Sequence, residues 1–175
     1  MEEFILEKAK NIKLLLLDVD GVLTDGRIIY DSKGRDSKFF DVRDGLGVYC
    51  LKRAGIKTIL ITAKGSKAIE PRAKDMGVEA IYKNILPKSA ALEEILLKYK
   101  VTSEEVCFVG DDLVDLCMMK RVGFPVAVFN ACQEIKKASA YITFKEGGRG
   151  AVREVAELIL KAQGKWQETI KIYDV

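Results

Sequence analysis

The sequence contains no histidine, only three prolines, and no apolar run long enough to span a membrane. Without histidine, acid–base chemistry must rely on carboxylates, lysines, tyrosines or cysteines. The four cysteines show no CxxC spacing and mostly lie within apolar stretches, which argues against a zinc site and a disulfide framework. The first residues also lack the basic region of an export signal. We therefore expect a reduced, cytoplasmic protein that does not enter a membrane.

The composition that remains is typical of a globular domain. Of the 175 residues, 49% are hydrophobic and 31% are charged, and the net charge is +3. This length is enough to bury a core, and because no linker or repeat is visible we expect one domain over residues 1–175. A small net charge without a dense basic run argues against a nucleic-acid partner, although it favours a small anionic substrate.

Short apolar runs of strand character alternate with amphipathic segments of helical period. The expected strands are 12–19, 57–61, 80–82, 106–109, 126–129 and 141–143, and the expected helices are 45–54, 66–76, 88–99, 112–120, 133–138 and 150–162. This alternation predicts an α/β fold, namely a doubly wound, parallel, Rossmann-like sheet with helices on both faces.

One segment, at about 26–41, interrupts the alternation. Two strand-like runs, 27–30 and 36–40, flank a Ser-Lys-Gly-Arg turn, which predicts a small β-hairpin inserted after the first strand. An ordinary loop is the alternative. Because the segment follows the most charged strand end, we favour a flap over a binding site.

Aspartates gather after two of the expected strands. Strand carboxyl ends share one edge of a parallel sheet, and ligands bind there. So many carboxylates at one edge would repel one another unless a cation lay among them, and Mg²⁺ prefers such oxygen ligands. Helix capping accounts for one of them, Asp112, but not for the whole set. The set is Asp18 and Asp20 after the first strand, with Asp111, Asp112 and Asp115 after the fourth.

Four short motifs match, in order and spacing, those of a known enzyme family. They are Asp-Val-Asp-Gly-Val-Leu-Thr from Asp18, then Thr62, then Lys88, and Gly-Asp-Asp-Leu-Val-Asp from Gly110 to Asp115. The sequence thereby resembles the haloacid-dehalogenase-type phosphatases over nearly its whole length. The first and fourth motifs are the specific ones.

The resemblance implies a Mg²⁺-dependent phosphatase with an aspartyl-phosphate intermediate. Asp18 would attack the phosphorus, and Asp20 would protonate the leaving alkoxide and later deprotonate the attacking water. The strand period of two places both side chains on one side of the chain, and with no histidine Asp20 has few rivals for the proton transfer. Mg²⁺ would be held by Asp18, Asp111 and the main-chain carbonyl of Asp20.

The other motif residues would support this chemistry. Lys88 would neutralise phosphoryl charge, and the Thr62 hydroxyl would bind a phosphoryl oxygen. Taken alone, each residue favours a plainer interpretation, Lys88 as a solvated lysine at a helix start and Thr62 as a turn former. Only their place in the series favours the catalytic interpretation. Asp112 and Asp115 would orient the ligands.

Further likeness narrows the expected substrate. The short hairpin and the segments 40–48 and 147–155 resemble a subgroup acting on 3-deoxy-D-manno-octulosonate 8-phosphate in lipopolysaccharide precursor synthesis. This implies a homotetramer in which a neighbour completes each site. Relatives often carry Gly-Arg where this chain has Ala63-Lys64, and a lysine lacks the planar fork of arginine. The implied substrate pocket comprises Asp20, Val42, Arg43, Asp44, Gly45, Lys64, Arg72, Lys88 and Arg149.

Three alternatives stay open. A related phosphatase would act on a sialic-acid-type 9-phosphate or another small metabolite. A non-catalytic assembly module would share the fold but not need the motifs. A phospho-acceptor signalling domain would share the acidic cluster, but it needs no second aspartate two residues after its nucleophile.

Overall fold

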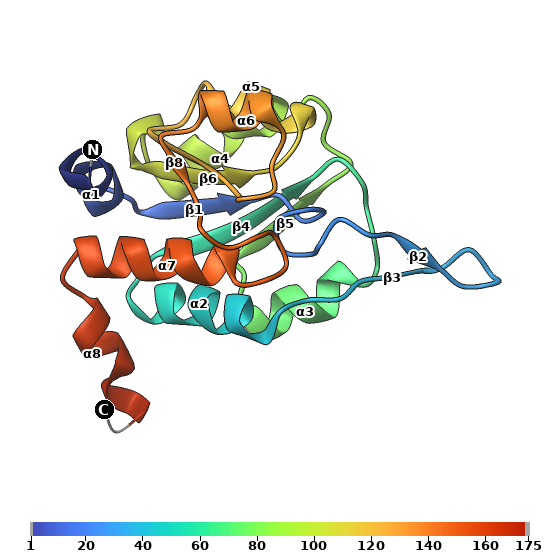
Figure 1. Cartoon of the computed structure of the whole chain (residues 1–175), viewed down its shortest axis with the longest axis horizontal. Coiled ribbons are helices and arrows are strands. Elements are labelled where there is room, and N and C mark those ends of the chain that lie inside the picture. The colour runs from blue at the N-terminus through green and yellow to red at the C-terminus, as the bar shows by residue number, and fades with distance from the viewer. Residues whose placement is uncertain (1, 174–175) are drawn as a thin grey trace.

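The computed structural model describes residues 2–173, and its centre is a six-stranded sheet in the order β5-β4-β1-β6-β7-β8 (Figure 1). All neighbouring strands in it are parallel. The four leucines of β1 are buried on both faces, because helices cover the sheet on each side. The strands are β1 Leu14–Leu17, β4 Lys57–Thr62, β5 Ala80–Lys83, β6 Val106–Gly110, β7 Phe124–Ala127 and β8 Tyr141–Ile142.

The helices form a layer on each face of this sheet, which confirms the predicted doubly wound α/β fold (Figure 1). One layer contains α2 Val42–Arg53, α3 Ile69–Met76 and α7 Ala151–Ala162, and the other contains α4 Leu92–Tyr99, α5 Leu116–Met119 and α6 Gln133–Ala138. Two further helices, α1 Glu2–Lys10 and α8 Trp166–Ile170, were not predicted. Short 3-10 turns complete the elements: η1 Lys88–Ala91, η2 Ser103–Glu105, η3 Leu113–Asp115 and η4 Lys171–Tyr173. No helix among the described residues is long and apolar enough to cross a membrane.

Some predicted boundaries were wrong for local reasons. The helix predicted at 112–120 is split into η3 and α5. The strand predicted at 126–129 begins at Phe124. A proline usually argues against a strand interior, so the prediction began after Pro125, but the Pro125 carbonyl still accepts a hydrogen bond from the Ala140 amide at 2.8 Å. The helix predicted from 66 begins at Ile69, after a turn in which the Ser66 hydroxyl accepts a bond from the Ala68 amide.

The inserted hairpin is present as predicted. Its strands β2 Ile29–Tyr30 and β3 Asp36–Ser37 pair antiparallel and project beyond the sheet (Figure 1). The Asp31 carboxylate organises the turn by accepting bonds from the amides of Lys33 and Arg35, both at 2.9 Å. The hairpin makes no ladder with the main sheet within residues 2–173, and its side chains Tyr30 and Lys38 contact Lys64 and Asp20 of the site below.

The topology of the sheet determines where a ligand can bind. From β1 the chain moves to β4 and β5 on one side, whereas β6 lies on the other side of β1 and leads to β7 and β8. The connections therefore diverge between β1 and β6, and a crevice opens at their carboxyl ends. Asp18 and Asp111 are the residues that follow these two central strands.

A buried carboxylate joins α2 to α7. The Asp44 oxygens accept hydrogen bonds from the amides of Gly150 at 3.3 Å and Arg153 at 2.8 Å, at the start of α7. Asp44 is 1% exposed, and this burial raises the pKa of its carboxyl to about 6 despite the two amides. Asp44 therefore acts structurally in this chain, and its predicted substrate contact stays a prediction.

This arrangement predicts a specific pH dependence of stability. The pKa of Asp44 is about 6 in the folded chain and near 3.8 in the unfolded one, so the folded state binds more protons in that window. Raising the pH from 4 to 7 should therefore destabilise the wild type relative to Asp44→Asn, by up to about 3 kcal/mol. Urea unfolding at several pH values measures this difference.

The control is an aspartate whose pKa is lowered by folding instead of raised. Hydrogen bonds from Arg35 lower the pKa of the exposed Asp31, so Asp31→Asn should lose stability relative to the wild type as the pH rises. A difference between wild type and Asp44→Asn that does not change with pH would contradict the assignment.

Candidate active site

The loop after β1 turns back sharply and brings Asp18 and Asp20 to the crevice. The Thr24 hydroxyl holds this turn by accepting bonds from the amides of Gly21 at 3.3 Å and Gly26 at 3.2 Å. Gly21 has a φ of +91°, and a Cβ there would lie 1.9 Å from the Asp111 carboxylate. Only glycine lets the loop approach Asp111 this closely.

Asp115 packs against the backbone at the carboxyl end of β6. One Asp115 oxygen accepts a bond from the Asp111 amide at 2.9 Å, and a Cβ on Gly110 would meet it at 2.6 Å. Asp112 is exposed and accepts a bond from the Leu113 amide at the start of η3, which is the capping role expected for it. Asp115 is fully buried and faces the site.

Lys88 lies at the centre of the acidic cluster. Its side chain is 0% exposed, and its Nζ lies 2.5 Å from an oxygen of Asp18 and 2.5 Å from an oxygen of Asp115. Burial opposes the charge of this ammonium, but the two carboxylates outweigh burial and raise the pKa of Lys88. Lys88 is therefore not a solvated lysine at a helix start.

Asp18, the nucleophile predicted from the sequence, is almost completely buried. Asp18 is 5% exposed, and burial raises the pKa of its carboxyl to about 6, with Lys88 opposing and Asp115 adding to the rise. At neutral pH the carboxylate is therefore mainly ionised, as a nucleophile must be.

Three carboxylates offer a place for a divalent cation. Oxygens of Asp18, Asp111 and Asp115 lie within 4.8 Å of one another. Burial, together with the charges of Asp18 and Asp115, raises the pKa of Asp111 to about 8, whereas Lys88 opposes the rise. A hard cation such as Mg²⁺ fits this donor set. The side chain of Asp20 lies outside this trio, and the main-chain contact predicted for Asp20 stays a prediction.

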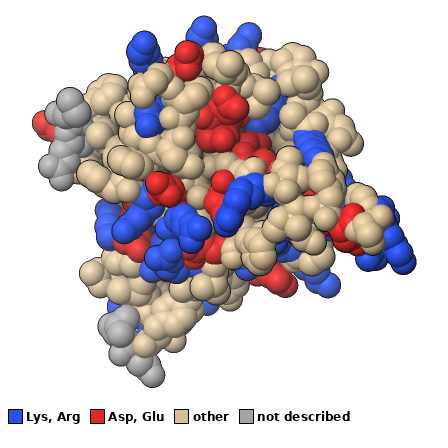
Figure 2. All heavy atoms as spheres, turned by 45° about the vertical axis from the view of Figure 1, so that its right-hand side comes forward, with Lys and Arg blue, Asp and Glu red and all other residues tan. Residues whose placement is uncertain are grey.

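A cavity of about 300 Å³ lies over these groups. Figure 2 shows this side of the molecule, where acidic side chains lie in a hollow next to lysines and arginines. The Thr62 hydroxyl lies at its wall, where it donates a bond to the Lys64 carbonyl at 2.9 Å. The cavity brings together all four predicted catalytic residues, Asp18, Asp20, Thr62 and Lys88. It is lined by Asp18, Asp20, Gly26, Thr62, Ala63, Lys64, Lys88, Asp111, Asp112 and Val114.

Other predicted pocket residues lie apart from this cavity. A separate hollow of about 350 Å³ is lined in part by Val42, Arg43, Gly45 and Arg72. Arg149 lies in a third hollow, of about 390 Å³, and its guanidinium is 3.7 Å from the Asp25 carboxylate. Within one chain these residues and the cavity over Asp18 do not share a pocket, so their substrate contacts stay predictions.

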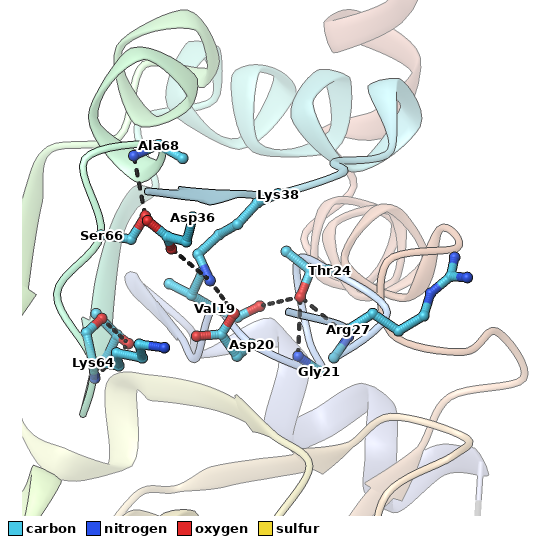
Figure 3. Close-up of polar contacts among 12 residues, drawn as sticks. Val19, Asp20, Gly21, Thr24, Arg27, Asp36, Lys38, Lys64, Ser66 and Ala68 are labelled. Atoms are coloured by element: carbon cyan, nitrogen blue, oxygen red, sulfur yellow. Dashed lines mark hydrogen bonds and ion pairs between the residues drawn. The ribbon is translucent and has the colours of Figure 1, made fainter. Parts of the chain in front are cut away.

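The hairpin contributes a residue that the sequence analysis did not single out. Lys38 reaches from the hairpin to the Asp20 carboxylate and forms an ion pair with it (Figure 3). No local pattern marks this residue, because residues 35–38 are all polar and residues 39–40 are both phenylalanine, so the segment shows no polar–apolar alternation.

The doubly wound sheet with aspartates after its two central strands defines the class of protein. The chain belongs to the family of haloacid dehalogenase-like hydrolases, whose model matches residues 61–154. It is also similar to particular members of that class. It is 43% identical over 164 residues to the 3-deoxy-D-manno-octulosonate 8-phosphate phosphatase of Salmonella typhi, over 94% of this chain and 87% of that protein.

Solved structures give the same result. The 3-deoxy-D-manno-octulosonate 8-phosphate phosphatase of Moraxella catarrhalis, in complex with magnesium, phosphate and the sugar acid KDO, matches with a TM-score of 0.95 at 44% identity, over 99% of each chain. The enzyme of the same name from Yersinia pestis has a TM-score of 0.92 and 41% identity, over 94% of this chain and 89% of that one.

The position of Lys88 generates a prediction about stability. Lys88→Met would leave two buried carboxylates without a counter-charge, and we expect the free energy of unfolding to fall by about 3–5 kcal/mol. Adding Asp115→Asn to that variant should restore part of the loss, because one uncompensated charge is then removed. Urea denaturation measures both effects.

The matched control is Lys137→Met, at an exposed position of α6. It makes the same chemical change and should alter stability by less than about 0.5 kcal/mol. Equal losses in the two lysine variants would show that the ion pairs of Lys88 do not matter for stability.

Proposed function

We propose that the protein is a Mg²⁺-dependent phosphomonoester hydrolase that converts 3-deoxy-D-manno-octulosonate 8-phosphate to the free sugar acid and phosphate. The observation that carries the reaction class is the pair Asp18 and Asp20 in one cavity with Lys88 and the Asp111 carboxylate. The substrate rests on the similarity to the Moraxella catarrhalis enzyme, which was crystallised with magnesium, phosphate and KDO.

The first step forms a covalent bond to the enzyme. An Asp18 oxygen attacks the phosphorus, and the bond from phosphorus to the sugar oxygen breaks. Asp20, protonated at this stage, transfers its proton to that oxygen, so that the sugar acid leaves as an alcohol. Lys88 holds the other Asp18 oxygen at 2.5 Å and keeps the nucleophile oriented.

The second step releases phosphate. A water molecule attacks the phosphorus of the aspartyl-phosphate while Asp20, now ionised, takes a proton from it. The bond between phosphorus and the Asp18 oxygen breaks, and both carboxyls return to their starting states. Asp20 thus serves as the general acid in the first step and as the general base in the second.

Positive charge is needed because an anion attacks a phosphate dianion. In this proposal Asp18, Asp111 and the main-chain carbonyl of Asp20 would hold Mg²⁺, which would supply charge stabilisation to the phosphoryl oxygens. Asp115 is engaged with Lys88 and with the Asp111 amide, so it orients the ligands, as Asp112 is proposed to do from outside. The Thr62 hydroxyl and the Lys64 ammonium line the cavity wall where phosphoryl oxygens would bind.

We also propose a homotetramer in which a neighbour completes the substrate pocket. The predicted recognition residues around Arg43, Arg72 and Arg149 lie outside the cavity of their own chain, so a neighbour could bring them to it. The hairpin provides an apolar surface for such contacts, with Ile28, Ile29, Tyr30 and Phe39 exposed at 48%, 41%, 57% and 69%.

The activity is tested with a panel of phosphate esters. We expect Mg²⁺-dependent phosphate release that EDTA abolishes, with the highest kcat/KM for the octulosonate phosphate rather than a sialic-acid-type 9-phosphate or simple phosphates. Asp18→Asn should show no turnover because it lacks the nucleophile. Asp20→Asn should lose roughly 10²–10⁴-fold in kcat.

Circular dichroism of both variants checks that the fold is retained. Full activity in Asp18→Asn would refute the nucleophile. A preference for another ester, with the Asp18 and Asp20 effects intact, would change the substrate but keep the reaction class.

The assembly is tested separately by light scattering. A tetramer has four times the chain mass of 19.5 kDa. Ile29→Lys on the hairpin should reduce that mass, because it places a charge in the proposed apolar contact. Leu97→Lys, on α4 and 82% exposed, is the matched control and should not. A wild-type monomer would contradict the proposal.

A further inference from the structure

Lys38 is a buried lysine that the reaction described above does not use. It directly follows β3, and its side chain is 2% exposed. Its neighbours Ser37 and Phe39 are exposed, whereas Asp36 and Phe40 are partly buried. The extended segment therefore presents alternate side chains to the body of the protein, and Lys38 lies on the inner side of the hairpin.

The partner of Lys38 is the proposed acid–base residue. The Nζ donates a short hydrogen bond to one oxygen of Asp20 and lies 3.8 Å from an oxygen of Asp36 (Figure 3). These are the two carboxylates that pair with Lys38 among the residues the structure describes. The Asp36 oxygen is buried and has no hydrogen-bond partner there, so Asp20 is the main acceptor of the ammonium.

Stability alone gives a poor explanation for this pair. Removing an ammonium from water costs several kcal/mol, and a well-packed apolar side chain in place of a buried ion pair is often as stable or more so. A hairpin that only covered the cavity would be served by an apolar residue at this position. The charge at Lys38 instead meets one oxygen of the carboxylate whose direction matters for proton transfer.

We propose that Lys38 is a positioning residue for Asp20. By holding one carboxylate oxygen, the Nζ keeps Asp20 in one rotamer and leaves the other oxygen for the leaving group and then for the attacking water. The inference rests on the proposed phosphatase reaction, but it needs no particular substrate. It also makes the hairpin part of the reaction centre of its own chain.

The role gives a kinetic signature that depends on the leaving group. A sugar alkoxide is a poor leaving group and needs the proton from Asp20, whereas 4-nitrophenolate is stable and leaves without it. The ratio kcat/KM reports steps up to the release of the alcohol, so it isolates the first proton transfer. A defect in positioning Asp20 must therefore be larger for an alkyl phosphate than for 4-nitrophenyl phosphate.

The test compares Lys38→Met with the wild type on both kinds of ester. We expect kcat/KM to fall about 10- to 100-fold for the alkyl phosphate and less than about threefold for 4-nitrophenyl phosphate. Asp20→Asn should show the same selectivity with a larger effect. Lys38→Arg, which restores a cation that can hold the carboxylate, should recover part of the loss on the alkyl ester.

The matched control is Lys33→Met, the same change at an exposed position in the turn of the same hairpin. It should leave both ratios unchanged, and light scattering checks that both variants keep the wild-type assembly. Inhibition by inorganic phosphate separates positioning from direct binding of the phosphoryl group. An unchanged inhibition constant in Lys38→Met supports positioning, and a weakened one together with equal losses on both esters overturns it.

Two further outcomes have distinct meanings. Wild-type kinetics in Lys38→Met on both esters would also overturn the inference. If the wild type cleaves glycerol phosphate but not the octulosonate ester, the proposed substrate is wrong, yet glycerol phosphate serves as the alkyl ester and the comparison still decides the role of Lys38.

Discussion

The site depends on one buried ammonium held between two carboxylates. Lys88 lies 2.5 Å from both Asp18 and Asp115, and none of the three side chains is more than 7% exposed. A group of carboxylates at a sheet edge is unstable without positive charge, and Lys88 supplies the part that the protein itself provides. Burial and the charges of Asp18 and Asp115 raise the pKa of Asp111, and oxygens of these three carboxylates within 4.8 Å of one another fit a divalent cation.

This arrangement of charges requires the backbone to pass very close to the carboxylates. Gly21 lies where any side chain would collide with Asp111, and Gly110 lies against Asp115 in the same way. The doubly wound topology brings the loops after β1 and β6 side by side, and the glycines let them touch. The catalytic geometry is therefore a consequence of sheet order combined with two positions that exclude a Cβ.

The hairpin contributes a second ion pair to the site, separate from the ion pairs of Lys88. Lys38 meets Asp20 from the inner side of the hairpin, while Lys64 donates a bond to the Tyr30 hydroxyl at 2.5 Å and ties the hairpin to the wall of the cavity. The two carboxylates that follow β1 thus have different partners: Asp18 pairs with Lys88 from the 3-10 turn η1, and Asp20 pairs with Lys38 from the hairpin. This difference matches their different proposed roles.

The alternation of strands and helices, the hairpin, and the aspartates at strand ends were readable from the sequence, because each is a local pattern or a short motif. The helices α1 and α8 were not, because they gain stability mainly by packing against the rest of the fold. The burial of Lys88, the contact of Asp44 with the start of α7 and the contact between Lys38 and Asp20 were decided by tertiary structure alone. They join residues 70, 106 and 18 positions apart in the chain, and no local pattern reports which side chains will meet over such distances.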